Sequence, residues 1–188
     1  MPADTKAKLL DSAERLARAR GYNGFSYADL AQDIGIRTAS IHYHFRAKSD
    51  LALAMVERYV ERVGAALEHV AAKASCGADC IRGYLQIYRD AVHGGSTLCL
   101  CVSLASDAET LEAPVLGVVQ RFHVDGIAWL ADAYRRGAAD GSIANVADPE
   151  LEASATLALV EGAQLMARAA AGLGPFDAAV AQLRTRMD

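Results

Sequence analysis

The sequence contains no run of about 20 apolar residues, the length that a membrane-spanning helix requires. Its N-terminal residues, MPADTKAK, lack the apolar centre of a secretory signal peptide. Cysteine is scarce, with four residues, and in a reducing compartment such cysteines stay as thiols. We therefore expect a cytoplasmic protein in which Cys76, Cys80, Cys99 and Cys101 form no structural disulfide.

Proline is equally scarce, with four residues in 188, and no segment has the alternating pattern of a convincing β-strand. Apolar residues instead recur three and four positions apart, which is typical of helices packed on one face. The pattern predicts an all-α protein of about nine helices, with no internal repeat and no low-complexity linker. The expected helices cover approximately residues 6–20, 26–34, 38–45, 49–73, 78–93, 98–113, 114–138, 149–171 and 176–186.

The net charge of −4 alone would argue against a nucleic-acid partner, but the charges are unevenly distributed. Residues 1–50 contain eight Lys and Arg against six Asp and Glu, and the remainder contains 11 against 17. An acidic body repels DNA from the wrong face of the molecule, so this asymmetry would orient binding through the N-terminal part.

Residues 26–51 indicate two short helices joined by a tight turn. Ser26 can cap the first helix, with Asp29 three residues later at the positive end of its dipole. Gly35 supplies the left-handed residue that ends a helix. Ile36 and Ile41 anchor the second helix, and five polar side chains of this segment are left to point outward: Arg37, Thr38, Ser40, Tyr43 and His44.

The charge of this segment fits the same interpretation. Between Ile34 and Lys48 there are three cations and no carboxylate. A helix-turn-helix that reads DNA needs a small, donor-rich second helix for the major groove and flanking cations for phosphates. The sequence therefore predicts a DNA-binding helix-turn-helix.

The same residues resemble the DNA-binding domain of the tetracycline-repressor (TetR) family of bacterial transcriptional regulators. The resemblance rests on Gly21-Tyr22, Phe25, Ser26, Gly35-Ile36, the closing signature His42-Tyr43-His44-Phe45-Arg46-Ala47-Lys48, and Leu51. Three positions depart from the family pattern: Arg37 replaces a capping Ser or Thr, Ala39 replaces Gly, and His42 replaces Tyr. The resemblance implies a helix-turn-helix domain at residues 1–48 and an effector-binding and dimerisation domain at residues 49–188.

Roles in DNA binding follow for individual residues. We expect DNA contacts from Ser26, Arg37, Thr38, Ala39, Ser40, His42, Tyr43, His44 and Lys48. Lys48 is expected to contact a phosphate, and the alternative is an ordinary solvated lysine. For His42 the alternative is a surface histidine that only partly replaces the phosphate bond of the usual tyrosine. Phe45 is interpreted as a core residue that fixes the third helix against the first.

A single helix-turn-helix contacts few bases, so such proteins bind as dimers to near-palindromes whose half-sites lie about 34–36 Å apart. The resemblance implies a homodimer through the last two helices. The candidate interface residues are Leu157, Glu161, Leu165, Arg168, Phe176, Val180 and Leu183. The apolar positions of the last helix form a stripe that would be wasted on solvent. The alternative is that this stripe packs on its own subunit.

A second motif surrounds two cysteines. Ser96 or Thr97 can cap the sixth helix, which would place Cys99 in its first turn, where the helix dipole lowers the pKa of a thiol. The segment also resembles an electrophile-responsive branch of the TetR family, in which the cysteine matching Cys99 reacts. Alternatively, Cys99 and Cys101 are small buried apolar residues.

The body of the protein is expected to enclose an effector site. Besides Cys99 and Cys101, its candidate residues are Tyr84, Tyr88, Phe122, His123 and Trp129, each of which is more often a core residue. Cys76 and Cys80 share a helix face but lack well-placed histidines, so we predict no metal and no cofactor. A small molecule or an electrophile would tilt the fourth helix and change the spacing between half-sites.

Two other classes of protein remain as alternatives. A cysteine-dependent enzyme would need a glycine-rich nucleophile turn or a base near Cys99 or Cys101, and the sequence offers neither. A ligand- or redox-sensing helical protein without specific DNA binding would show no salt dependence of DNA affinity. Among regulators, release of a repressor by its ligand is the expected mode, although the chain does not encode the sign of regulation.

Overall fold

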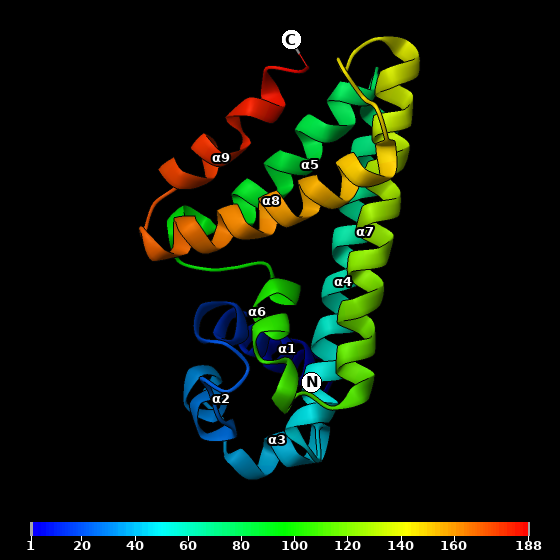
Figure 1. Ribbon diagram of the computed structural model, residues 1–188. Coiled ribbons are helices and arrows are strands. Elements are labelled where there is room, and N and C mark those ends of the chain that lie inside the picture. The colour runs from blue at the N-terminus through cyan, green and yellow to red at the C-terminus, as the bar shows by residue number, and fades with distance from the viewer. Residues whose placement is uncertain (1, 188) are drawn as a thin grey trace. The chain divides into compact units, whose positions relative to one another are not determined.

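The computed structural model describes residues 2–187, and within them it contains helices and no strand (Figure 1). By its internal contacts the chain forms two compact units. The first unit contains the residues up to Glu61 together with Leu100–Gln120, and the second contains Arg62–Cys99 together with the residues from Arg121 onward. The expected boundary between residues 48 and 49 separates a DNA-binding domain from an effector-binding and dimerisation domain, and it stays a prediction.

The first unit contains the helical pair expected from the sequence. Its helices are α1 (Pro2–Arg20), α2 (Tyr27–Ile34), α3 (Thr38–His44) and α6 (Leu100–Ser106), followed by the 3₁₀ turn η2 (Ala108–Thr110). α1 packs against both α2 and α6, and α2 packs against α3. The core of this unit is apolar and closed to solvent. Six of its side chains are 0 % exposed, namely those of Leu9, Ala13, Leu30, Ile41, Leu51 and Met55.

The second unit is also helical. Two long helices, α4 (Lys48–Lys73) and α7 (Ala113–Asp140), begin in the first unit and end in the second. The remaining elements are α5 (Gly77–Ala91), the 3₁₀ turn η1 (His93–Gly95), α8 (Pro149–Ala169) and α9 (Gly174–Arg184). α8 packs against α5, α9 and η1, and Figure 1 shows the orange α8 crossing in front of the green α5.

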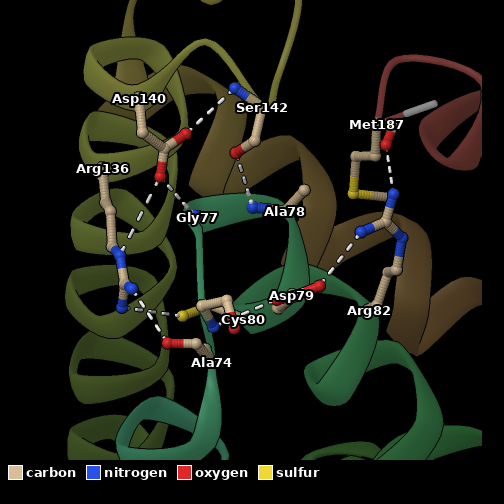
Figure 2. A network of polar contacts seen from close by, with 11 residues as sticks. Ala74, Gly77, Ala78, Asp79, Cys80, Arg82, Arg136, Asp140, Ser142 and Met187 are labelled. Carbon is tan, nitrogen blue, oxygen red and sulfur yellow. Dashed lines mark hydrogen bonds and ion pairs between the residues drawn. The ribbon is translucent and has the colours of Figure 1, made fainter.

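The N-terminus of α5 is held by the end of α7 (Figure 2). The Gly77 N–H donates to the Asp140 carboxylate at 2.8 Å, and the Ala78 N–H donates to the Ser142 hydroxyl at 3.0 Å. Arg136 donates to the Ala74 carbonyl at 2.9 Å, one turn before α5 begins. The Asp140 and Ser142 side chains supply the acceptors that the first N–H groups of a helix otherwise lack.

The expected helix at residues 98–113 is wrong in length. The structure has only the seven-residue α6, followed by the separate turn η2. α6 begins at Leu100, so neither Ser96 nor Thr97 occupies its cap position, and their hydroxyls donate to the carbonyls of His93 and Ala91. Hydroxyl side chains that bond to nearby backbone groups compete with helix formation in this way. Cys99 therefore precedes α6 and does not lie in its first turn.

Candidate nucleic-acid interface and the polar cluster of the second unit

The first helix of the candidate pair begins and ends as its residues predict. The Ser26 hydroxyl accepts from the Asp29 N–H, and the Asp29 carboxylate accepts from the Ser26 N–H at 2.7 Å, which together form a capping box. The Ser26 hydroxyl also donates to this carboxylate, and the bonds from the Ser26 hydroxyl and N–H hold the pKa of the Asp29 carboxyl below its ordinary value. At the other end Gly35 takes a left-handed φ of 71°. The turn into α3 is thus fixed by local bonds.

α3 presents a polar face to solvent. Ile41 and Phe45 are buried, at 0 % and 4 % exposure, and they hold the helix against the unit. The Lys6 ammonium of α1 lies 5.6 Å from the centre of the Phe45 ring, which agrees with the predicted core role of Phe45 beside the first helix. The predicted contact residues that are exposed are Ser26, Arg37, Thr38, Ala39, Ser40, His42 and Tyr43, whereas His44 is half-buried.

Two features of α3 bear on base and phosphate contacts. Arg37 is the N-cap residue, yet its side chain makes no capping bond, so the guanidinium can extend from the start of the helix. Tyr43 is 83 % exposed, which is unusual for an aromatic ring without a binding role. Its ring meets the His44 ring edge-on at 5.2 Å, so the two aromatic side chains form one surface feature.

The His42 side chain is exposed, but its ring also contacts two neighbouring groups of the protein. Its ring meets the Tyr27 ring at 4.9 Å, and its Nδ1 lies 3.4 Å from the Arg46 carbonyl. Tyr27 in turn donates from its hydroxyl to the Ala47 carbonyl at 2.7 Å, and burial raises its pKa to about 12. If a neutral His42 donates from Nδ1 to this carbonyl, its Nε2 is an acceptor that can take a hydrogen bond from a water molecule.

Lys48 has a structural position that the sequence did not reveal. Its ammonium donates to the carbonyls of Tyr22 and Phe25, each at 2.5 Å, and lies 4.5 and 4.2 Å from the centres of their rings. Partial burial lowers the pKa of this ammonium, which the Asp107 charge opposes. An ammonium has three donors, so two bonds to carbonyls leave one for the predicted phosphate contact.

The turn after α1 is also held by groups distant in sequence. The Asp107 carboxylate accepts from the Tyr22 N–H at 2.7 Å and from the Asn23 amide at 3.1 Å. The same Asn23 amide donates to the Thr110 hydroxyl at 2.9 Å. Sequence reasoning missed these contacts because 85 residues separate Tyr22 from Asp107, and no local pattern signals such a pairing.

In the second unit, the predicted effector residues are mostly core residues. Tyr84 is completely buried, and its ring lies 4.6 Å from that of Tyr88 and 5.9 Å from that of Trp129. Burial raises the pKa of the Tyr84 hydroxyl well above its ordinary value. Phe122 is likewise buried, whereas His123 and Trp129 are partly exposed.

A polar cluster lies among these aromatic rings and consists of His123, Glu161, Gln164 and Cys99. His123 Nε2 is 3.0 Å from a Glu161 oxygen, and this carboxylate raises the pKa of the imidazole. The Gln164 side chain is 0 % exposed, and its oxygen accepts from the Cys99 N–H at 2.7 Å. Its amide nitrogen has no hydrogen-bond partner among the described residues. A buried donor without an acceptor is a group that a ligand oxygen can satisfy.

The reactivity expected for the Cys99 thiol stays a prediction. Cys99 and Cys101 are both 0 % exposed, as expected if they are small buried apolar residues. Cys99 directly precedes Leu100, the first residue of α6, so it lies at the positive end of that short helix rather than inside its first turn. In the second unit Cys80 is buried beside Arg136, and burial raises the pKa of the Cys80 thiol. No group of three or more metal-binding side chains occurs in the described part of the chain.

The predicted dimer residues divide into two sets. Phe176 and Val180 are 0 % exposed within the subunit, so they support α9 from inside and offer no surface to a partner. Their apolar spacing therefore reflects packing within their own subunit, which is the alternative to a dimer contact given by the sequence. On α8, Leu157 is buried, Glu161 and Arg168 are partly exposed, and Leu165 is 49 % exposed; on α9, Leu183 is partly exposed.

Three large apolar side chains of α8 are exposed to solvent. They are Leu151 at 68 %, Leu165 at 49 % and Met166 at 56 %. Leu165 lies about four helical turns after Leu151, so these side chains share one side of the helix.

No helix among the described residues has the length and apolarity to span a membrane.

The chain is similar to known proteins along nearly its whole length. Residues 9–55 match the family model described as "Bacterial regulatory proteins, tetR family". A crystal structure of a TetR-family transcriptional regulator from Agrobacterium tumefaciens is 30 % identical, covers 100 % of both chains and superposes with a TM-score of 0.94. The HTH-type transcriptional repressor NemR of Escherichia coli K12 is 25 % identical over 96 % of this chain and 92 % of its own. The reduced form of E. coli NemR superposes with a TM-score of 0.84 at 26 % identity, covering 98 % and 97 % of the two chains.

Proposed function

Because the chain belongs to the TetR family of transcriptional regulators, we propose that it is a homodimeric repressor whose two α3 helices bind the half-sites of a palindromic operator. The observation that carries this proposal is the face of α3. Its apolar residues are buried, whereas Arg37, Thr38, Ser40 and Tyr43 are exposed together. Small donors suit base edges, and the cations at both ends suit phosphates.

The operator can be found without knowing the regulated genes. A pool of randomised duplexes is selected on the purified protein, and the recovered sequences are aligned. The proposal predicts an inverted repeat whose half-sites are centred about 10 base pairs, or a multiple of this, apart. Recovery of unrelated sequences, with affinity that does not depend on salt, would favour the alternative of a helical sensor without specific DNA binding.

Dimerisation is proposed through the exposed apolar side of α8. Leu165 and Met166 are the central candidates, with the partly exposed Glu161 and Arg168 beside them. Replacing both central residues by glutamate should convert the dimer to a monomer in sedimentation equilibrium, because two carboxylates would be buried at the interface. The control is Ala138→Glu, which adds a carboxylate at an exposed position of α7. An unchanged dimer in the double variant would move the interface elsewhere.

Release by an effector is proposed to start at the polar cluster of the second unit. The buried Gln164 amide and the His123–Glu161 pair are suited to a small molecule that carries an acceptor oxygen. An electrophile that modifies Cys99 is the covalent version of this proposal, for which the similarity to NemR is the support.

The two versions are separated by measuring operator binding with and without N-ethylmaleimide, for wild type and for Cys99→Ser. Release in wild type alone supports covalent sensing at Cys99. Continued binding by both proteins supports a non-covalent effector, which agrees with the complete burial of the Cys99 side chain. Release of both proteins to the same extent would place the reactive thiol at another cysteine.

A further inference from the structure

Two thiols lie at the N-terminus of α5, apart from the DNA-reading face and from the polar cluster. Cys76 is the N-cap residue of this helix, and its side chain makes no capping bond. Cys80 follows four residues later and is 4 % exposed, whereas Cys76 is half-buried. Residues four apart lie on one side of a helix, with Cβ atoms about 5–6 Å apart. The two thiols therefore form a pair on one side of α5.

A cation from α7 reaches the buried member of this pair. The Arg136 guanidinium donates toward the Cys80 sulfur at 3.9 Å, as Figure 2 shows. It also donates to the Ala74 carbonyl at 2.9 Å and lies 4.0 Å from the Asp140 carboxylate, so three groups fix its position. All of these residues belong to the second unit. A guanidinium in this place can balance negative charge on the sulfur.

The reach of Arg136 follows from the crossing of the two helices. A Cβ at Gly77 would lie 2.1 Å from the Gly137 nitrogen, so the backbones of α5 and α7 meet where both have glycine. Arg136 is the neighbour of Gly137 in the sequence, and Cys80 lies one helical turn after Gly77. The contact between guanidinium and sulfur is thus set by the backbone.

The half-buried member of the pair is held by Asp79. This carboxylate accepts from the Ser75 N–H at 3.1 Å and from the Cys76 thiol, and these bonds keep the pKa of the Asp79 carboxyl below its ordinary value. Burial raises the pKa of the Cys80 thiol, Arg136 lowers it, and Asp79 and Cys76 raise it further. Cys76 and Cys80 are therefore close enough to interact electrostatically.

The spacing of the pair favours one bridging ion over a direct bond between the sulfurs. A disulfide needs Cβ atoms about 3.5–4.5 Å apart, closer than is ordinary for residues four apart on a helix. A bond from a thiolate to a metal ion is about 2.3 Å long, so one ion between two sulfurs spans about 4–5 Å. The described part of the chain offers no group of three or more metal-binding side chains. Zinc, which takes four ligands, is therefore not suited to this pair.

We propose that Cys76 and Cys80 bind a soft monovalent ion, Cu(I), between their two sulfurs. Soft thiolate ligands select Cu(I), and the argument against zinc does not apply to an ion that needs only two ligands. Each thiol gives its proton to the solvent, so two thiolates and one Cu(I) form a complex with a single negative charge. Arg136 balances that charge. The site goes beyond the DNA-binding function proposed above and does not depend on it.

The first test measures Cu(I) binding by the full-length, reduced protein under argon, in competition with the coloured chelator bicinchoninate. Wild type should take one ion per chain from the chelator. Cys76→Ala should abolish this uptake, and circular dichroism checks that the variant is folded. Ser75→Ala is the matched control, because it changes the preceding exposed side chain and leaves both thiols in place. No uptake by wild type, or equal uptake by wild type and Cys76→Ala, would overturn the proposal.

The other two cysteines are tested in the same assay. The double variant Cys99→Ala/Cys101→Ala retains only the proposed pair, and it should still take one ion per chain. Cys80→Ala, which removes the buried thiol beside Arg136, should take none. Loss of uptake in the double variant, with uptake retained in Cys80→Ala, would place the ion at Cys99 and Cys101 and refute the assignment.

The number of ligands is tested with other ions. Ag(I) also accepts two sulfur ligands, so it should displace Cu(I) from wild type, whereas Zn(II) at the same concentration should not. X-ray absorption at the copper edge should show two sulfur neighbours. Displacement by Zn(II), or a copper ion surrounded mainly by nitrogen and oxygen, would contradict a site made of two thiolates.

The role of Arg136 has a separate test. Arg136→Met removes the balancing charge and should weaken Cu(I) binding about tenfold, as is usual for groups that act on a metal from outside its ligands. Arg136→Lys keeps the charge and should recover most of the loss. If the two variants lose affinity equally, Arg136 does not act through its charge, and this part of the proposal is wrong.

Discussion

Replacing Lys48 by methionine should destabilise the first unit strongly, even in the absence of DNA. The side chain keeps its length and its apolar stem, but the donor to the Tyr22 and Phe25 carbonyls is lost. Both of these residues are buried, at 8 % and 5 % exposure. Their carbonyls would keep only such water as can enter beside a half-buried side chain.

The size of the effect follows from those two acceptors. An acceptor left without a partner costs about 1–3 kcal/mol, and the lost cation–π contacts with the two rings add about 0.5–1 kcal/mol. Water that enters the site recovers part of this, and methionine packs well against aromatic rings. We therefore expect Lys48→Met to lower the free energy of unfolding by about 2–4 kcal/mol.

The measurement is urea unfolding followed by circular dichroism, for Lys48→Met and for the control Arg46→Met. Arg46 is an exposed cation two residues earlier, and its replacement should change stability by no more than about 0.5 kcal/mol. If the two variants are equally stable, Lys48 is not a structural cation, and its role would be confined to the predicted phosphate contact.

Three further predictions concern other parts of the chain. Ser26→Ala removes the capping box of α2 and should cost about 1 kcal/mol in urea unfolding, and no loss would mean that the cap is dispensable. Because Glu161 raises the pKa of His123, their pair stabilises the fold fully below about pH 6.5 and loses this contribution as pH rises through the raised pKa. The stability difference between wild type and His123→Gln should therefore be about 0.5–1 kcal/mol at pH 6 and disappear as the pH rises through the raised pKa, whereas a difference that grows with pH would contradict the assignment. Gly77→Ala would place a Cβ 2.1 Å from the Gly137 nitrogen and should lower the stability measured by thermal unfolding by more than about 3 kcal/mol. The control Gly64→Ala has nothing within 4 Å of its added Cβ and should raise the stability by about 0.5–1 kcal/mol. Equal effects of the two changes would refute the close approach of α5 and α7.

The features that the sequence predicted correctly are those that depend on neighbouring residues. Ser26 and Asp29 are three residues apart, and Gly35 follows the last turn of α2, so the start and end of that helix are local events. The expected start of a helix at residue 149 is likewise confirmed, and there the Asp148 carboxylate accepts from the N–H groups of Glu150 and Leu151. Such signals act within one turn and need no knowledge of the tertiary structure.

The limits of a local signal are seen before α6. Ser96 and Thr97 are good capping residues, but their hydroxyls bond to carbonyls of the preceding turn instead. Capping and turn formation use the same side chains, so the sequence pattern does not decide between them. The expected position of Cys99 inside the first turn of α6 is therefore wrong, whereas the resemblance to the electrophile-responsive branch does not depend on that cap.

Apolar spacing has a different limit, because it predicts that a face is buried but not what covers it. Phe176 and Val180 recur at helical spacing, and the structure buries them within their own subunit. Leu165 and Met166 on α8 are exposed instead, although their apolar spacing in the sequence is no stronger than that of Phe176 and Val180. Only the three-dimensional packing distinguishes a core stripe from a surface that is available to a partner.

The candidate site shows both limits together. The outward face of α3 could be predicted because it follows from the positions of Ile41 and Phe45. The bonds from the Tyr22 N–H and the Asn23 amide to Asp107, and from Asn23 to Thr110, could not be predicted, because the partners are 84 to 87 residues apart and no local pattern signals them. Gln164 offered a weak signal as an amide within the largely apolar α8, but its acceptor role toward Cys99 is a tertiary contact.

The central claim, that α3 binds DNA, is tested most directly by the salt dependence of affinity for the selected duplex. Fluorescence anisotropy would be measured from 50 to 200 mM salt for wild type, Arg37→Ala and Arg121→Ala, the last an exposed arginine of α7. The account predicts a steep loss of wild-type affinity with salt. Arg37→Ala should either lower that slope by about one or relax the preference at one base, while Arg121→Ala should match wild type. Equal behaviour of the two variants, or wild-type binding that does not depend on salt, would contradict the account.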